Sequence, residues 1–460
     1  MTVRLLHYSD LETALDEPEQ CGALAGTIAA LRDEETVLVG SGDNTAPGAL
    51  SLETTGRIAV SFFELVEPDA DTFGNHDFDF GSDTARELAD AAPQEWLCAN
   101  ATVDGERFAD AETEPSTLVE AGAEQVGIVG VAHPKTDVMN PAAEDVTFED
   151  PVQAVRQEAN RLREAGADYV VVISHCGRTD ERIAAETDVD AVVGGHVHDV
   201  HEAVVEGTAV VRPGRAGRYV SEVVLGDDAR TAVHQVDDGH VDDDVVALLR
   251  EKHSEYGLDE VVTTVETPIP RTEEAATTAG STIGSLVTDA LRWKTGADVA
   301  LSPPGGIRSG DPLVGDVTVS DIISLSPYED ELALVELSGE RLREAFVAVP
   351  FGYHDDGFPD RHCSHVSGAR LRWDDEVGEL VEATVDGEPL DPDETYTLAA
   401  DDYVIETNHV NDAFGEDDVI ERYGLGRDAI VEFAREVGFD GETTRRVERP
   451  RLDEPPEQTN

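Results

Sequence analysis

Short segments rich in β-branched residues alternate with helical segments over about the first 225 residues, and this alternation restricts the possible folds. The predicted strands are RLLHYSD, TVLVGSGD, ADTFGNHD, QVGIVGVA, DYVVVISH, DAVVGGHVH and TAVVRPG. Amphipathic segments lie between them, such as residues 151–165, which begin with a proline, as first turns of helices often do. Strands that alternate with helices predict a layered α/β domain. We expect residues 209–225 to form antiparallel strands at a sheet edge.

Polar side chains follow nearly every predicted strand of this region. In open α/β sheets, binding sites form at the carboxyl ends of strands, so residues from distant segments can meet there. Mixed Asp, Asn and His ligands suit divalent transition-metal ions, and a bridging Asp can serve two of them. The pattern therefore predicts a metal centre. The strand-end candidates are Asp10, Glu12, Asp43, Asn75, His76, Asp79, His175, His196 and His198.

Taken singly, these residues have ordinary explanations. A strand-end Asp often caps a helix or closes a turn, and a single strand-end His is often a hydrogen-bonded structural residue. The segment GGHVH at 194–198 is more specific, because its two His can face one site and its glycines permit close approach. The metal-centre hypothesis depends on the whole set of residues.

The chain of 460 residues contains 99 acidic and 33 basic residues, which gives a formal net charge of −66. The acidic residues are spread along the whole chain. This composition resembles that of proteins from salt-loving cells, in which a Debye length of about 3 Å at 1 M salt screens the repulsion. We expect low salt to unfold or inactivate the protein. The negative charge also argues against broad binding to nucleic acid or to anionic membranes.

We expect a cytoplasmic protein. The first residues, MTVRLLHYSD, lead into a predicted strand rather than a signal peptide, and no apolar segment approaches the roughly 18 residues of a membrane span. The cysteines, Cys21, Cys98, Cys176 and Cys363, show no C-x-x-C spacing and fit a reduced compartment. The sequence does not indicate an oligomeric state.

The length allows two domains of ordinary size. We expect a catalytic domain over residues 1–235 and an acidic linker with a helix over 236–262. A second mixed α/β domain is expected over 263–448, with helices over 281–295 and 339–348 and strands in ADVALS and ELALVELSG. Residues 449–460 are expected to form a flexible tail.

The candidate metal ligands carry a resemblance to a known family. Asp10, the GD at Asp43, GNHDFD at 74–79, His175 and GGHVH have the order and spacing of the dinuclear metallophosphatases, the calcineurin-like phosphoesterase superfamily. The fuller form GNHDFDFG, followed by a second domain that contains GGIR, is similar to the 5′-nucleotidase family. This resemblance implies a layered β-sandwich flanked by helices, with a second, mixed α/β substrate-binding domain.

The resemblance also implies roles for the matching residues and two divalent metal ions, Mn, Zn or Mg. A hydroxide that bridges the ions would attack phosphorus in line with the leaving oxygen. His76 would stabilise the transition state or protonate the leaving group, and Asp79 would orient His76. The implied ligands are Asp10 and His198 for the first ion, Asn75, His175 and His196 for the second, and Asp43 as the bridge.

The chain departs from the family at Glu12. The family has D-x-H at this position, with the His as a ligand of the first ion, whereas this chain has D-L-E. A carboxylate ligand would make the site harder and more anionic, which favours Mn²⁺ or Mg²⁺ over Zn²⁺. Alternatively, Glu12 is a solvated acid and the first ion binds weakly.

The second domain offers a substrate-binding loop. Gly305, Gly306 and Arg308 match the family's GGxR loop, and Arg308 would contact the substrate phosphate. Arg308 could instead form a surface ion pair.

The family also holds the base between two aromatic rings. Cys363 occupies the usual position of the first ring, for which Phe358 or Tyr353 could substitute, and Phe414 is the candidate for the second.

The leading hypothesis is a metal-dependent phosphomonoesterase that acts on nucleoside 5′-monophosphates, with Mn²⁺ as the favoured metal. A cyclic-nucleotide phosphodiesterase or a nucleotide-sugar hydrolase on the same site is the first alternative. A non-catalytic nucleotide-binding protein is the second, because the D-x-E departure could mark a lost activity.

Overall fold

The computed structural model describes residues 3–226, 229–237, 239–350, 362–374, 377–407, 410–439 and 446–449. The chain divides into two compact units, Met1–Tyr256 and Gly257–Asn460. The boundary falls inside the segment 236–262 that was expected to link two domains. Of the expected tail, residues 450–460 lie outside the described residues.

Within the described part of the first unit, two six-stranded sheets pack face to face. Leu5 and Val39 of one sheet meet Ile128 and Ile173 of the other in a common core. The first sheet has the order β15 (Arg230–Gln235), β14 (Tyr219–Val224), β1 (Arg4–Tyr8), β2 (Thr36–Gly40), β3 (Ala70–Thr72) and β4 (Glu95–Leu97). The second has the order β12 (Val200–Val205), β13 (Thr208–Pro213), β11 (Ala191–Gly194), β10 (Tyr169–His175), β8 (Glu124–Ala132) and β7 (Ser116–Ala121).

The centre of each sheet is parallel. Strands β1 to β4 run parallel in the first sheet, and β8, β10, β11 and β13 do so in the second. Parallel strands are covered on both faces, which explains their nearly continuous Val and Ile content. Because they end at the same edge, the polar residues that follow them gather at one place.

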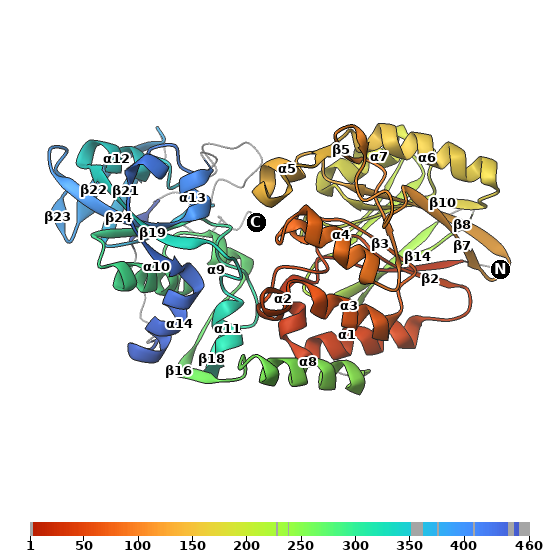
Figure 1. Cartoon of the computed structure of the whole chain (residues 1–460), viewed down its shortest axis with the longest axis horizontal. Helices are drawn as coiled ribbons and strands as arrows, with labels where there is room; N and C mark the ends of the chain where they lie inside the picture. Colours follow the sequence, from red (N-terminus) through yellow and green to blue (C-terminus); the bar gives the residue numbers. More distant parts are fainter. Residues whose placement is uncertain are drawn as a thin grey trace, which may run out of the picture. The chain divides into compact units, whose positions relative to one another are not determined.

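Helices cover the outer faces of both sheets (Figure 1). Helices α6 (Pro151–Ala165) and α7 (Asp180–Glu186) pack on the second sheet, where Val155 and Ile183 meet Val172. Helices α1 (Pro18–Leu31) and α3 (Arg57–Val66) cover the outer face of the first sheet. Helix α8 (Asp243–Glu255) packs against α1, and a Cβ at Gly22 would lie 2.4 Å from Val246. Shorter elements of this unit are α2 (Ala49–Thr54), α4 (Ser82–Ala91), α5 (Thr136–Met139), β5 (Ala101–Val103), β6 (Glu106–Arg107) and β9 (Thr147–Phe148).

The prediction for residues 209–225 is corrected in one respect. The two strands there, β13 and β14, belong to different sheets and lie inside them rather than at an edge. The neighbouring edges are formed by β12 and β15, which pair antiparallel with β13 and β14, while β7 and β4 form the opposite edges. The mixed polar and apolar residues of β12 and β15 match their partly exposed positions.

The second unit contains a five-stranded sheet, within its described residues, with the order β20 (His365–Ser367), β17 (Val299–Ser302), β24 (Thr395–Asp401), β19 (Glu331–Ser338) and β25 (Val419–Leu425). Smaller sheets consist of β23 (Glu388–Pro389), β22 (Glu379–Val385), β21 (Ala369–Asp374) and β26 (Val447–Glu448), and of β16 (Val261–Ile269) with β18 (Leu313–Thr318). The helices are α9 (Glu273–Thr277), α10 (Thr282–Thr295), α11 (Val319–Ile323), α12 (Gly339–Val347), α13 (Asp402–Glu406) and α14 (Gly426–Glu436).

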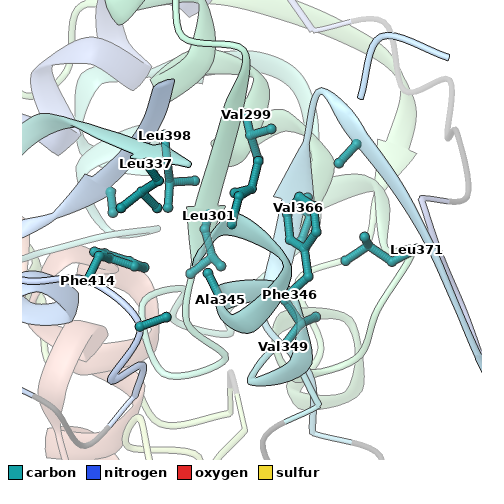
Figure 2. Packing of buried hydrophobic residues seen from close by; sticks show 14 of the residues in the cluster. Val299, Leu301, Leu337, Ala345, Phe346, Val349, Val366, Leu371, Leu398 and Phe414 are labelled. Atoms are coloured by element: carbon teal, nitrogen blue, oxygen red, sulfur yellow. The ribbon is translucent and has the colours of Figure 1, made fainter. Parts of the chain in front are cut away.

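One core joins the five-stranded sheet of the second unit to α12. Phe346 of α12 lies close to Val366 of β20, and Leu337 and Leu398 pack together on the sheet (Figure 2). The predicted mixed α/β organisation of both units is therefore confirmed. No helix among the described residues has the length and apolar character needed to span a membrane.

Candidate metal centre

The carboxyl ends of the parallel strands bring the predicted ligands together in the first unit. Asp10 follows β1, Asp43 follows β2 and Asn75 follows β3, while His175 ends β10 and His196 follows β11. Within the described residues, three overlapping groups present ligand atoms that lie within 4.8 Å of one another. These groups are Asp10–Glu12–His198, Asp10–Asp43–His175 and Glu12–Asp43–His76.

One half of this cluster pairs carboxylate and amide oxygens with imidazole nitrogens. His175 Nε2 lies 3.0 Å from Asp43 Oδ2, and His196 Nδ1 lies 2.9 Å from Asn75 Oδ1. Atoms of these kinds at such short spacing would be able to hold a divalent ion together, so the two pairs fit a metal site. His175 Nδ1 donates to the Ser41 carbonyl at 2.7 Å, which leaves Nε2 available as a ligand.

The other half is built from Asp10, Glu12 and His198. His198 Nε2 lies 3.3 Å from Glu12 Oε1 and 3.6 Å from Asp10 Oδ1. Glu12 is only 2% exposed, so the alternative of a solvated surface acid does not fit the structure. The backbone amide of Glu12 donates to the Asp43 carbonyl at 3.2 Å, which fixes Glu12 beside Asp43.

The loops that carry these residues have unusual backbone conformations. Asp10, Glu12, Asp43 and His196 all have positive φ angles, of 50°, 47°, 53° and 72°. Side chains other than glycine rarely occupy this region, and such strain concentrates at functional sites. Gly74 permits the close approach of two loops, because a Cβ there would lie 2.2 Å from Asp43 Oδ1.

His76 lies beside the cluster and is held by a carboxylate. Its Nδ1 lies 3.0 Å from Asp79 Oδ1 and 3.1 Å from Asp79 Oδ2, and its backbone amide donates to Asp43 Oδ1 at 2.7 Å. Asn140 Nδ2 donates to Asp79 Oδ1 at 2.8 Å and to the Asn75 carbonyl at 2.7 Å. The ring of His76 therefore has a fixed orientation at the edge of the ligand cluster.

The carboxylate of Asp77 holds the loops that carry Asp43 and Gly74. It accepts hydrogen bonds from the backbone amides of Asp43, Gly74 and Thr45 and from the Thr45 hydroxyl, at 2.7 to 3.1 Å. Burial and the nearby Asp43 raise the pKa of Asp77 to about 6. Asp77 therefore stabilises the loops that carry Asp43 and Gly74.

The electrostatics of the cluster favour bound cations. Burial opposes charge on His175, but the carboxylates of Asp43 and Asp10 outweigh it and raise the pKa of His175 to about 10. Burial likewise disfavours charge on Asp43, yet His175 and His76 hold its pKa below the usual range. Burial lowers the pKa of His196 well below its ordinary value. A proton thus sits between buried ligands, where a divalent ion can replace it, and the donor set fits such ions.

Some residues of the site were missed by sequence reasoning. Asn140 comes from a segment with no ligand pattern. The His133 ring lies tilted beside His196 with ring centroids 4.9 Å apart, and Arg215 Nη1 lies 3.1 Å from His198 Nδ1. Asn140 precedes a proline in an ordinary turn signature, and Arg215 lies in the loop RPGRAG. These residues reach the site through tertiary contacts, so no local motif identifies them.

The second unit places the GGIR loop at a surface. Gly305 is exposed, while Gly306 and Arg308 are half-buried. The Arg308 backbone amide donates to Leu325 O at 2.8 Å, and its guanidinium carbon lies 5.6 Å from the centre of the Tyr328 ring. The loop is thus held in a defined conformation with a cation over an aromatic face.

The structure does not support Phe414 as a base-stacking residue. Phe414 is 2% exposed and packs in the core beside Leu337 and Leu398 (Figure 2), so its ring faces are covered. The apolar ring is better accommodated in the core than in a wet site. The other candidate rings, Phe358 and Tyr353, lie outside the described residues.

Comparisons with known proteins agree with this geometry. Residues 3–200 match the calcineurin-like phosphoesterase family, and residues 261–416 match the 5′-nucleotidase C-terminal domain. An apyrase of Tabanus yao is 25% identical over 86% of this chain and 83% of its own length. A 5′-nucleotidase of Diplobatis ommata is 24% identical over 68% of this chain and 63% of its own length.

A solved structure shows the same two-domain fold. The 5′-nucleotidase precursor from Thermus thermophilus superposes with a TM-score of 0.83 at 20% identity, covering 97% of this chain and 99% of that chain. Both family matches, in the expected order, account for the ligand cluster of the first unit and for the GGIR loop of the second. The chain therefore belongs to the 5′-nucleotidase family of calcineurin-like phosphoesterases, and it is a hydrolase of phosphoesters that uses divalent metal ions.

Proposed function

We propose that this protein hydrolyses phosphate monoesters and that nucleoside 5′-monophosphates are its main substrates. The observation that carries the proposal is the convergence of carboxylate, amide and imidazole ligands beside a His76–Asp79 pair. A 5′-nucleotidase and an apyrase among the relatives favour nucleotides as the substrate class.

The chain's own residues divide into ligands and a proton-handling group. Asp43 would be shared by two ion positions, one completed by Asn75, His175 and His196 and the other by Asp10, Glu12 and His198. When bound, such ions act as Lewis acids that neutralise phosphoryl charge and acidify water.

His76 is the group that would act on the substrate. Since Asp79 accepts the Nδ1 proton, Nε2 is the ring atom left to donate to a phosphoryl or leaving oxygen, and it does so from the imidazolium form, in which both ring nitrogens carry a proton. An oriented imidazole of this kind contributes general-acid catalysis or transition-state stabilisation. Asn140 holds Asp79 and thereby positions the pair.

Glu12 affects which divalent ion the site prefers. A third carboxylate beside Asp10 and Asp43 makes the donor set harder than the family's histidine would. We therefore favour Mn²⁺ or Mg²⁺ over Zn²⁺, with Mn²⁺ first.

Arg308 is the proposed phosphate contact of the second unit. Its half-buried guanidinium is held over Tyr328, which suits bidentate contact with a phosphate. Recognition of a base has weaker support, because the ring of Phe414 is buried. For this reason a cyclic-nucleotide phosphodiesterase and a nucleotide-sugar hydrolase remain the second candidates.

A substrate panel at molar salt with Mn²⁺ tests the proposal. It comprises AMP, a cyclic nucleotide, a UDP-sugar and a generic aryl phosphate, with the His76→Ala protein as the background control. We expect AMP to be turned over with the highest kcat/KM. A protein that cleaves only the diester or the pyrophosphate bond would refute the monoesterase assignment.

We also propose that the protein is cytoplasmic and that it requires molar salt. The side chains of Cys21, Cys98, Cys176 and Cys363 are all buried thiols, as is usual in a reducing cytoplasm. The formal charge of −66 supports adaptation to molar salt.

A further inference from the structure

In the ligand cluster, Nδ1 of His175 faces a hydrogen-bond acceptor, whereas Nδ1 of His198 faces a hydrogen-bond donor. Nδ1 of His175 lies 2.7 Å from the Ser41 carbonyl, which can only accept a hydrogen bond. Nδ1 of His198 lies 3.1 Å from Arg215 Nη1, and a guanidinium can only donate. The proton must therefore reside on Nδ1 of His175 and, in neutral His198, on Nε2.

This difference decides which ring is ready to bind a metal. A ligating histidine normally donates its second N–H to an oxygen acceptor, which leaves a lone pair on the nitrogen that faces the metal. His175 has this arrangement. In neutral His198 the proton occupies Nε2, the ring atom that lies 3.3 Å from Glu12 Oε1 and 3.6 Å from Asp10 Oδ1.

Arg215 also contributes charge at this position. Its Nη1 lies 3.8 Å from Glu12 Oε2, and the side chain is only 13% exposed. The next residue, Ala216, donates its backbone N–H to the Asp10 carbonyl at 2.8 Å, so the loop that carries Arg215 is fastened to the ligand strand. A guanidinium therefore stands beside the one residue at which this chain departs from D-x-H.

We propose that Arg215 is a positioning residue that makes the two ion positions unequal. The position of Asn75, His175 and His196 with Asp43 binds one divalent ion tightly. The position of Asp10, Glu12 and His198 binds its ion weakly, because Arg215 holds His198 in the wrong tautomer and partly neutralises Glu12. This inference rests on the proposed ligand roles and not on any particular substrate.

The test is a Mn²⁺ titration of the full chain at molar salt, without substrate. Calorimetry and the electron paramagnetic resonance signal of free Mn²⁺ give the affinity of each equivalent. We expect the second equivalent to bind about 10- to 100-fold more weakly than the first in the wild-type protein. Two equivalents of equal affinity would overturn the proposal.

Three variants test whether Arg215 causes the difference between the two Mn²⁺ affinities. Arg215→Gln replaces a pure donor by an amide that can accept the Nδ1 proton of His198, so the two affinities should converge. Arg215→Lys keeps the charge and the donor-only character, so the difference should persist. Arg230→Gln removes the same charge from an exposed position on β15 and should change neither affinity. An unchanged difference in a folded Arg215→Gln protein would contradict the proposal.

The histidine tautomer provides a readout that is independent of affinity. Nitrogen chemical shifts of ¹⁵N-histidine-labelled, metal-free protein should show His198 protonated at Nε2 and, in Arg215→Gln, at Nδ1. Protonation of wild-type His198 at Nδ1 would overturn the mechanism. If none of the panel substrates is hydrolysed, the proposed function fails while these measurements stand unaffected.

Discussion

The metal centre of the first unit and the GGIR loop of the second differ in how firmly their functional side chains are held. Asp10, Glu12 and Asp43 are buried at strand ends, have positive φ angles and share hydrogen bonds with neighbouring loops. Arg308 is half-buried on a loop, where a backbone bond and the Tyr328 ring restrain it. Reacting groups need fixed geometry, whereas a substrate contact can tolerate movement. We therefore expect kcat to depend on the first region and KM on the second.

Low salt is expected to have the largest effect, because it should unfold both units at once. Lowering the salt to about 0.1 M removes the screening of a surface whose acidic excess extends over both units, so both should unfold. Tryptophan fluorescence can follow the unfolding of both units, because Trp96 is buried in the first and Trp373 in the second. An equal osmolality of sucrose serves as the control. Full activity with an unchanged melting curve would remove the claim of salt dependence.

His76→Ala tests the catalytic half of the comparison. Loss of the oriented imidazole should lower kcat about 10²- to 10⁴-fold with little change in KM or in melting temperature. Steady-state kinetics with AMP at molar salt provide the measurement. His201→Ala on β12, where the ring faces Glu181 at 3.7 Å, is the matched control and should retain wild-type kcat. A similar loss in both variants would argue against a special role for His76.

Asp77→Ala tests whether the metal centre depends on its buried support. The substitution leaves the backbone amides of Asp43, Gly74 and Thr45 without their acceptor, so the free energy of unfolding should fall by about 3 kcal/mol. Urea denaturation at molar salt measures this change. Asp83→Ala on the exposed face of α4 should have little effect. Equal stability of the two variants would show that the loops are held by other contacts.

Arg308→Ala tests the binding half and should have the smallest effect. Loss of a charged contact to phosphate is expected to raise KM about 10- to 100-fold, with kcat nearly unchanged. Arg308→Lys should give an intermediate KM, because an ammonium cannot make the bidentate contact. Arg372→Ala removes an exposed arginine paired with Glu382 and should leave KM unaltered. A fall in kcat with constant KM would reverse the assignment of the two regions.

Much of the fold was predictable because local signals were strong. The helix expected at 151–165 has these same bounds as α6, where Asp150 caps the helix and Pro151 begins it. Runs of Val and Ile marked the parallel strands, since such strands are buried on both faces. The strands β12 and β15 were missed as sheet edges because their half-exposed residues carry little apolar pattern.

The sequence by itself determined the chemistry that the chain can offer: strand-end Asp, Asn and His residues, a His76–Asp79 pair and a glutamate in place of a histidine at position 12. Only the tertiary structure decided how these groups are used. It buried Glu12 beside His198, brought Asn140 and Arg215 to the site from separate loops, and placed Phe414 in the core. The physical reason is that spacing along a chain governs local conformation, whereas burial, tautomers and ion pairs depend on contacts between residues far apart in sequence.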